Sequence, residues 1–457
     1  MDSNISNTSF KDPSGFVFKK EEKIFRQINL VYKDDYDFLI SSGLYENLIS
    51  KRLLIEHEEV NTPFETNKGY KIIRPREIPF ISYPYEWCFS QLKDAALLTL
   101  EIQKTALEHQ MSLKDSTAYN VQFYKGKPTF IDTLSFEKYK KDTPWVAYKQ
   151  FCQHFLAPLA LMAYKDIRLN NLSKLYIDGI PLDLASSLLP FYSGFNIFVL
   201  THIHMHAKSQ KHYEDKADAS IKQVKMDLFG LKALINSLED AVKSLKLPNV
   251  ETEWGDYYNN TNYDQNASDS KSKIINEFIE ILAPKTLCDL GANLGAFSRE
   301  AAKKGINTIN FDIDPVAIEK NYLISKQNGE ENILALINDL TNPSPAIGWA
   351  NQERESFSDR AHFDTVMALA LIHHLSISNN LPFENSAKFF SKIAKSLIIE
   401  FVPKEDSQVK KLLSTREDIF PSYTQEGFEK VYSKYFDIKK IEKVLDSERT
   451  LYLMVRR

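Results

Sequence analysis

The spacing of apolar residues changes character along the chain. Over residues 91–111, apolar residues recur at helical intervals among charged ones, and this spacing predicts an amphipathic helix. Two short apolar runs then flank a Lys-Gly-Lys turn at residues 125–127, which predicts a β-hairpin. From about residue 271 to the end, helical and strand-like patterns alternate, as is typical of an α/β sheet. The pattern therefore predicts an α+β domain followed by an α/β domain.

We expect four segments along the chain. Residues 1–20 are polar and lack a regular period, so they are predicted to form a flexible arm. Residues 21–247 are predicted to form an α+β N-terminal domain that holds substrate or has an accessory role. Residues 248–270 are rich in Asn, Asp, Ser and Tyr and are predicted to be a linker or lid. Residues 271–457 carry the alternating pattern and form the α/β domain.

Composition and charge narrow the class of protein. Hydrophobic residues make up 43% and charged residues 26% of the chain, as in soluble globular proteins. The formal net charge of -4 argues against a dominant non-specific nucleic-acid surface, although a nucleic-acid substrate stays open. The three cysteines are far apart and odd in number, which favours a reducing compartment. Neither a signal core nor an uninterrupted apolar span is apparent, so we expect a cytoplasmic protein without a membrane segment.

The pattern that carries chemistry begins with a strand, a glycine turn and a helix. The predicted strand ends near Asp289, and Gly291, Asn293 and Gly295 form the turn. Glycines here leave the backbone open to a ligand, because a side chain would block its approach. The N-terminus of the following helix adds free N–H groups and positive potential. This arrangement predicts a site for a nucleotide-like cofactor.

Two acidic residues narrow the choice of cofactor. Asp312 ends the second predicted strand, where an acid binds ribose hydroxyls in dinucleotide folds, and Asp339 follows the third strand. A nicotinamide or flavin domain would carry a third glycine, but Phe297 and Ser298 follow Gly295. No turn that would clamp a phosphate is apparent. The pattern therefore favours S-adenosylmethionine, which has no phosphate, over a dinucleotide.

The D-x-G-x-N-x-G motif at residues 289–295 resembles the D/E-x-G-x-G-x-G motif of class I S-adenosylmethionine-dependent methyltransferases. The resemblance implies a Rossmann-like, seven-stranded sheet over residues 271–457, with its last strand inserted antiparallel. It assigns the methionine end of the cofactor to Asp289 and the turn, and the ribose to Asp312. The remaining cofactor contacts that it implies, around the adenine and at the end of the fourth strand, are Ile313, Asp339, Leu340 and Ala370.

Other stretches resemble one particular group of methyltransferases. The stretch FIDTLSFEKY in the N-terminal half and the stretch EFVPKEDSQVKK near the C-terminus are similar to segments of a group named for nodulation host specificity. With these stretches, the resemblance covers most of the chain. It implies methyl transfer and names no acceptor.

The fourth predicted strand, residues 363–371, runs into Ile-His-His-Leu and is expected to line the active site, because open α/β sheets bind ligands at strand carboxyl ends. The segment lacks the N/D-P-P-Y/F motif of methyltransferases that act on DNA or protein amides. It resembles the same segment of many small-molecule methyltransferases. His373 or His374 could be the general base, or both could have structural or cofactor-contacting roles. Glu400, at the end of the fifth strand, could contact substrate or be a solvated or capping charge.

Four aromatic residues of the predicted linker form a candidate lid. In class I methyltransferases, the segment before the first strand often covers cofactor and substrate, and the alternative is simple packing between domains. The four residues are Trp254, Tyr257, Tyr258 and Tyr263.

The N-terminal half resembles kinase-like folds in the spacing of three residues. Asp115, Asn120 and, after the predicted hairpin, Asp132 follow the order of a catalytic Asp and two metal ligands. Leu113 and Lys114 replace the usual His-Arg pair, and no glycine-rich loop or phosphate-pairing lysine is apparent. We interpret the three residues as a vestigial kinase-like site, and a turn-rich α+β substrate domain is the alternative.

Three histidines in the stretch H-I-H-M-H could converge on a metal only if the stretch were a strand. His202, His204 and His206 would share one face of a strand but would diverge on a helix. An incidental helix or loop is the favoured interpretation. The sequence predicts no metal site.

Taken together, these patterns predict an S-adenosylmethionine-dependent methyltransferase whose acceptor is a small molecule or a glycan. The expected chemistry is in-line displacement at the sulfonium methyl, for which the protein chiefly supplies proximity and orientation. Three alternatives stay open. They are an RNA methyltransferase acting on tRNA or rRNA, a bifunctional protein whose N-terminal half binds nucleotide, and a non-catalytic module that has kept the cofactor fold.

Overall fold

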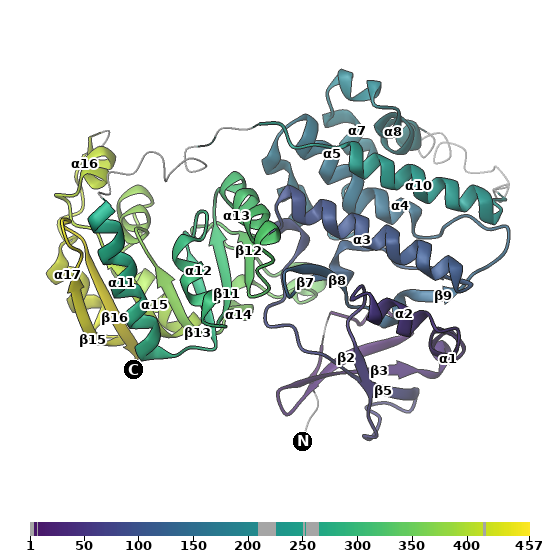
Figure 1. Cartoon of the computed structure of the whole chain (residues 1–457), viewed down its shortest axis with the longest axis horizontal. Helices are drawn as coiled ribbons and strands as arrows, with labels where there is room; N and C mark the ends of the chain where they lie inside the picture. Colours follow the sequence, from purple (N-terminus) through teal and green to yellow (C-terminus); the bar gives the residue numbers. More distant parts are fainter. Residues whose placement is uncertain (1–3, 7, 209–224, 250–251, 253–264, 415–416) are drawn as a thin grey trace. The chain divides into compact units, whose positions relative to one another are not determined.

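The computed structural model describes residues 4–6, 8–208, 225–249, 252, 265–414 and 417–457. The chain divides into two compact units. The first comprises Met1–Val250 and Ala346–Glu355, and the second comprises Glu251–Pro345 and Ser356–Arg457. Each unit has its own sheet (Figure 1). Each unit also has its own buried side chains.

The first unit begins with a five-stranded antiparallel sheet in the order β1-β2-β3-β5-β4. Its strands are β1 Asn4–Ile5, β2 Gly15–Lys20, β3 Lys23–Asn29, β4 His57–Glu59 and β5 Gly69–Pro75. The expectation of a flexible arm over residues 1–20 is wrong for β2, which pairs with β3 along its whole length. Phe18 of β2 is buried and stacks on Phe25 of β3, so cross-strand aromatic packing holds this segment in the sheet.

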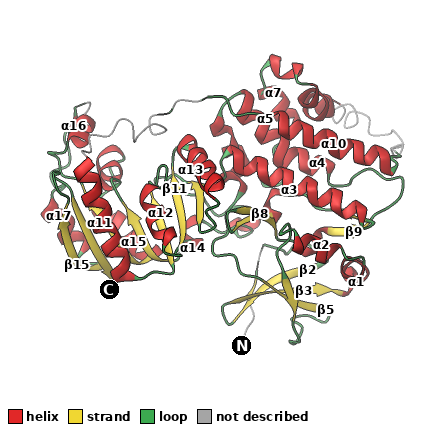
Figure 2. Ribbon diagram, viewed as in Figure 1, coloured by secondary structure: helices red, strands yellow, loops and turns green. Residues whose placement is uncertain are grey.

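Helices make up most of the remainder of the first unit (Figure 2). Helix α3, Phe89–Glu108, forms where the apolar spacing predicts a helix, and it packs against α10, Leu228–Ser244. The predicted hairpin is present as β7 Val121–Tyr124 and β8 Lys127–Phe130. Further elements are α1 Lys33–Ser41, α2 Leu44–Ser50, β6 Met111–Leu113, β9 Phe136–Lys138, α4 Tyr148–Phe151, α5 Ala157–Tyr164, α6 Leu172–Leu175, α7 Leu182–Leu188, α8 Ile197–Val199, and two short π-helices, η5 Cys152–Leu156 and η8 Leu200–Met205.

The segment Ala346–Glu355 belongs to the first unit, although its neighbours in the sequence belong to the second. Glu353 of this segment pairs with Lys11 at 2.8 Å, and the guanidinium of Arg354 lies 4.4 Å from the ring centroid of Tyr119. The C-terminal domain expected from the sequence is therefore interrupted at this point. A stretch of ten residues without a hydrophobic period gives no local signal of where it will pack.

The second unit is built on a seven-stranded sheet in the order β12-β11-β10-β13-β14-β16-β15. Strands β10 to β14 are parallel to one another, and β16 runs antiparallel between β14 and β15. The Rossmann-like sheet with an inserted antiparallel last strand is therefore confirmed. The strands are β10 Thr286–Leu290, β11 Asn307–Asp312, β12 Ile333–Ile337, β13 Phe363–Ala368, β14 Ala394–Phe401, β15 Phe436–Lys443 and β16 Thr450–Arg456.

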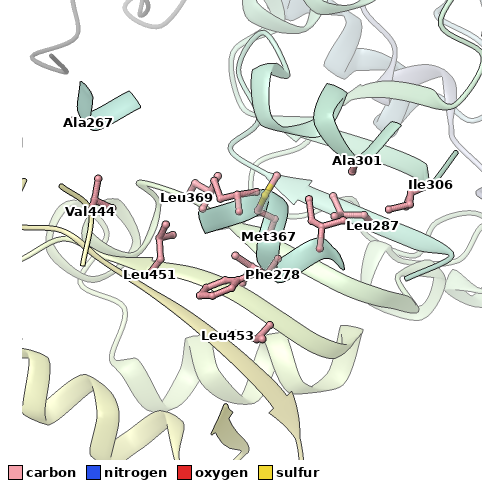
Figure 3. Close-up of a cluster of buried hydrophobic side chains, with 13 residues drawn as sticks. Ala267, Phe278, Leu287, Ala301, Ile306, Met367, Leu369, Val444, Leu451 and Leu453 are labelled. Carbon is pink, nitrogen blue, oxygen red and sulfur yellow. The ribbon is translucent and has the colours of Figure 1, made fainter. Parts of the chain in front are cut away.

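Amphipathic helices join this sheet through buried apolar side chains. Phe278 of the first helix packs in one core cluster with Leu287 of β10, Met367 of β13 and Leu453 of β16 (Figure 3). That helix begins at Gln265, inside the expected linker, because its apolar face already starts to pack there. The helices are α11 Gln265–Leu282, α12 Ala296–Lys303, α13 Pro315–Asn328, α14 Phe357–Arg360, α15 Phe383–Ile393, α16 Ser407–Leu413 and α17 Gln425–Tyr432.

Two further findings concern membrane-spanning helices and the cysteines. Within the described part of the chain, no helix is both long enough and apolar enough to cross a bilayer. Cys88, Cys152 and Cys288 are buried, and each is a free thiol.

The turn between β10 and α12 depends on one glycine. Gly295 has a φ of +76°, in the left-handed region. A Cβ atom added there would lie 2.7 Å from Nδ2 of Asn310 and 2.8 Å from Nδ2 of Asn321, and both asparagines are buried. Gly305 also has a positive φ, of +81°, but an added Cβ would meet no atom within 4 Å. A substitution at Gly295 would therefore cause both backbone strain and steric overlap, whereas one at Gly305 would cause backbone strain alone.

We expect Gly295→Ala to lower the free energy of unfolding by about 2–4 kcal/mol, the sum of left-handed strain and overpacking. Gly305→Ala is the control, and it should cost only the backbone strain, about 1 kcal/mol. The measurement is the midpoint of thermal unfolding of the full chain by calorimetry. Equal midpoints for the two variants would contradict the steric role of Gly295.

Candidate active site

The predicted cofactor residues gather at one edge of the sheet in the second unit. The carboxyl ends of parallel strands meet at this edge, and β10 lies between β11 and β13, where the order of the strands reverses. A crevice outside the sheet is expected at such a point. Asp289 lies in β10, Asp312 ends β11, and Asp339 and Ala370 follow β12 and β13.

Asp289 is almost completely buried next to the start of α12. The hydroxyl of Ser298, in the first turn of α12, donates a hydrogen bond to its carboxylate. Burial raises the pKa of Asp289 to about 7, and the charge of Asp312 adds to this effect, whereas the Ser298 hydroxyl and Lys271 oppose it. A cationic group bound nearby would therefore favour the ionised carboxylate.

The turn that follows β10 explains why asparagine is tolerated in the middle of the motif. Gly291 and Asn293 both have positive φ, of +77° and +49°. Asparagine is one of the few side chains that visit this left-handed region readily. The Asn293 N–H donates to Oδ2 of Asp312 at 2.8 Å, and the backbone carbonyl of Asn293 accepts from Nδ2 of Asn321 at 3.1 Å. The turn is thus bonded to the end of β11 and to α13.

Asp312 is held in place by backbone groups on both sides. In addition to the Asn293 bond, its Oδ1 accepts from the Asp314 N–H at 2.9 Å. Burial nevertheless raises the pKa of Asp312 to about 6, against the effect of these hydrogen bonds. The next residue, Ile313, is 56% exposed. An acid and an exposed aliphatic side chain therefore stand side by side at the end of β11.

The end of β12 offers one polar residue that the sequence did not single out as a contact. Asp339 accepts bonds from the backbone N–H and the hydroxyl of Thr341, at 2.8 and 2.7 Å, which shape the turn there. Leu340, beside it, is half-buried. Asn338 is 3% exposed, and its Nδ2 has no hydrogen-bond partner among the described residues. Its position directly after an apolar strand is the signal that could have identified it.

The turn after β13 carries the two candidate histidines. Ala370 has a φ of +48°, and the next residue, Leu371, would contact a Cβ atom placed on Gly291 at 3.5 Å. The turns after β13 and β10 therefore abut. His373 is 2% exposed and Nδ1 of its ring has no partner in the described structure, while its centroid lies 4.2 Å from that of His374.

Both histidines are neutral imidazoles near pH 7. Burial lowers the pKa of His373 well below its ordinary value, and neighbouring positive charges add to this effect. Burial likewise lowers the pKa of His374 to about 4. A neutral imidazole can accept a proton, but a pKa this far below neutral also makes it a weak base.

Glu400 is completely buried at the end of β14, so of the expected roles a charge that caps backbone N–H groups fits its position best. Its Oε2 accepts from Nζ of Lys271 at 2.7 Å and from the Ala370 N–H at 2.6 Å. It is therefore neither a solvated charge nor an exposed substrate contact in this structure. Sequence reasoning missed Lys271, which lies on α11 and has no local motif around it.

The expected lid lies outside the described residues. This applies to each of its four aromatic residues, Trp254, Tyr257, Tyr258 and Tyr263.

The first unit brings the three kinase-like residues together. Asn120 Nδ2 donates to Oγ of Ser135 at 3.1 Å, and the same hydroxyl donates to Oδ2 of Asp132 at 2.8 Å. Burial raises the pKa of Asp115, and the charge of Asp132 is its second cause, so the two carboxylates are near one another. The spacing in the sequence thus corresponds to a real cluster.

A cation of the chain itself faces this cluster. Arg26 of β3 donates to Oδ1 of Asp132 and, at 3.2 Å, to Oδ2 of Asp12. Oδ1 of Asp132 also accepts from the Leu134 N–H at 2.9 Å. Both oxygens of Asp132 therefore already accept bonds from protein groups. Among the described residues, no three His, Cys, Asp or Glu side chains are arranged to hold a metal ion.

The three histidines of H-I-H-M-H lie on or next to η8, where the rings of His202 and His206 both lie against Tyr148 and His204 has other partners. His202 bonds Tyr148 and Ser237, each at 2.9 Å. His204 bonds Ser186 at 2.7 Å and Ser193 at 3.0 Å. The side chains do not converge, as the helical alternative predicts.

Comparison with known proteins supports the assignment of the second unit. Residues 263–398 match a family model described as a methyltransferase domain. Nodulation protein NoeA from Rhizobium meliloti (strain 1021) is 34% identical over 458 residues, which cover 98% of this chain and 95% of that protein.

Several solved structures match less than half of this chain at low scores. They include magnesium protoporphyrin IX methyltransferase (ChlM) from Synechocystis PCC 6803 with bound SAH, at 16% identity, 45% of this chain, 93% of that chain and a TM-score of 0.32. N-methyltransferase NodS from Bradyrhizobium japonicum WM9 matches at 12% identity, 42% and 98% coverage and a TM-score of 0.31. The bifunctional kinase-methyltransferase WbdD matches at 16% identity, 44% of this chain, only 41% of that chain and a TM-score of 0.29.

Similarity at these TM-scores does not indicate activity. The match to NoeA, in contrast, extends over nearly the whole of both proteins. The chain therefore belongs to the family of nodulation protein NoeA, and it is a methyltransferase.

Proposed function

We propose that the protein transfers the methyl group of S-adenosylmethionine to a small-molecule or glycan-type acceptor. The observation that carries the choice of cofactor is the pair of buried acids, Asp289 and Asp312, beside the glycine turn. S-adenosylmethionine carries positive charge on its sulfonium and on its ammonium group. A dinucleotide would instead bring two negative phosphates toward the glycine turn beside Asp289, at a cost in electrostatic energy, whereas Asp312 could bind the ribose of either cofactor.

The residues at the carboxyl edge then have distinct proposed roles. Asp289 and the turn over residues 291–295 receive the methionine end, and Asp312 receives the ribose hydroxyls. The adenine packs on the exposed side chain of Ile313. The remaining proposed contacts of the cofactor lie at the ends of β12 and β13. They are Asn338, Asp339, Leu340 and Ala370.

The reaction needs few groups from the protein. S-adenosylmethionine supplies an activated methyl group, and the acceptor attacks that carbon in line with the bond that breaks. The chain holds the two reactants at this geometry, which is the larger part of the catalysis. When the acceptor loses a proton, His373 or His374 in its neutral form takes it up.

Separate observations bear on the acceptor class and on the compartment. The segment after β13 lacks the motif of enzymes that methylate DNA bases or protein amides, which favours another acceptor. The three buried free thiols fit a reducing compartment, and we place the protein in the cytoplasm.

Binding of S-adenosylmethionine by the full chain tests the proposal directly. We expect Asp312→Ala to weaken binding at least tenfold, or about 1.4 kcal/mol, because the ribose loses its charged acceptor. Asp437→Ala is the matched control, since that aspartate pairs with Arg457 on the surface, and it should bind as the wild type does. Isothermal titration calorimetry gives both affinities. Wild-type affinity in Asp312→Ala would overturn the site assignment. Methyl-labelled cofactor with fractionated cell extract then identifies the acceptor.

Stability of the ligand-free protein should depend on pH through the two acids. Their folded-state pKa values, about 7 and about 6, lie above the usual carboxyl value, so the folded chain holds protons that the unfolded chain releases. Their contribution is complete below about pH 4 and is lost as pH rises through 6 to 7. We expect Asp289→Asn to show a shallower loss of stability over this window. Urea unfolding midpoints at pH 4.5, 6 and 7.5 measure it, and an unchanged slope would contradict the burial of a titrating Asp289.

A further inference from the structure

A buried ion pair lies next to the turn after β13. Nζ of Lys271, on α11, is 2.7 Å from Oε2 of Glu400, and their side chains are 3% and 0% exposed. Arg449 lies 3.9 Å from the other carboxylate oxygen of Glu400 and bonds Asp406 at 2.8 Å. The four charges sum to zero within the interior of the second unit.

Stability alone does not account for such a pair. Removing two ions from water has a large desolvation penalty, and apolar residues of similar volume often replace a buried pair at no cost in stability. Buried ionic groups are better explained when they fix a particular geometry. Glu400 contacts such a geometry at the backbone of Ala370.

Glu400 holds a strained backbone position. The oxygen that accepts from Lys271 also accepts from the Ala370 N–H at 2.6 Å. Ala370 has a φ of +48°, a conformation that disfavours any residue with a Cβ atom. Alanine keeps this bend only if the surrounding structure holds it, and such strain gathers at functional sites.

The bend forms part of the proposed cofactor site. Ala370 and Leu371 lie at the carboxyl edge, and Leu371 abuts the turn at Gly291. Lys271 also contacts the start of α12, since its Nζ lies 5.0 Å from the ring centroid of Phe297. The ion pair therefore connects the turn after β13 with the helix that follows the glycine turn.

We propose that Lys271 and Glu400 are positioning residues for the methyl donor. Glu400 fixes the Ala370 bend against the cofactor, and Lys271 orients the carboxylate that does so. This inference rests on the proposed function. It assigns a purpose to Glu400 that does not require contact with substrate.

The test separates positioning from stability with Lys271→Met/Glu400→Met, which removes both charges and keeps the side-chain volumes. Each single variant leaves one buried charge and should unfold at a lower temperature, whereas the double variant should recover most of the wild-type midpoint. Its affinity for S-adenosylhomocysteine, measured by calorimetry, should nevertheless fall about ten- to a hundredfold, the scale of a misplaced site. Adding Ala370→Gly should restore affinity, because glycine adopts a positive φ without support.

The matched control is Lys304→Met/Glu280→Met, which removes a surface pair of the same length in the same unit and should bind as the wild type does. A folded double variant at Lys271 and Glu400 with wild-type affinity would overturn the proposal. If that variant does not fold, Glu400→Asp keeps the charge for Lys271 but cannot reach the Ala370 N–H. Unchanged affinity in Glu400→Asp would likewise overturn it. Failure of the wild type to bind S-adenosylhomocysteine would overturn the proposed function and this inference with it, whereas wild-type affinity in the folded double variant would overturn this inference alone.

Discussion

The parallel pairing of β10 with β11 and β13 is the constraint on which the second unit depends. In this register Asp289 lies opposite Asn310 on one side and Met367 on the other. Successive side chains of a strand point to opposite faces, so a slip by one residue would move Asp289 away from Ser298 and α12. The glycine turn, the bend at Ala370 and the end of β11 meet only because these strands end together. The chemistry of the site is thus a consequence of strand register.

The sheet and the glycine turn could be predicted because their signals are local. Five residues of alternating or apolar pattern indicate a strand, and the spacing from Asp289 to Gly295 fits one turn. The ion pair between Lys271 and Glu400 could not be predicted, since its members are 129 positions apart and no local pattern links them. The same holds for Arg26 and Asp132, which are 106 positions apart. Long-range polar contacts leave no period in the sequence.

Errors at the N-terminus have a physical explanation too. Residues 15–20 contain two lysines and two phenylalanines, and the polar residues around them suggested a flexible arm. The buried side chain of Phe18 was enough to place the segment in a sheet. In the same unit, the spacing of Asp115, Asn120 and Asp132 pointed to a real cluster, but the cation facing it is Arg26. A guanidinium there balances charge permanently, whereas a bound ion could come and go.

The segment Ala346–Glu355 bears on how this chain can be divided or recombined. Two modules joined end to end would each be a continuous stretch, but here the first unit contains a piece supplied from within the second. A fragment that ends at residue 250 would leave Lys11 without Glu353 and the Tyr119 ring without Arg354. Exchange of the C-terminal half with that of a relative would need a matching loop between β12 and β13. A division of the chain that keeps the first unit whole therefore has to keep residues 346–355 with it.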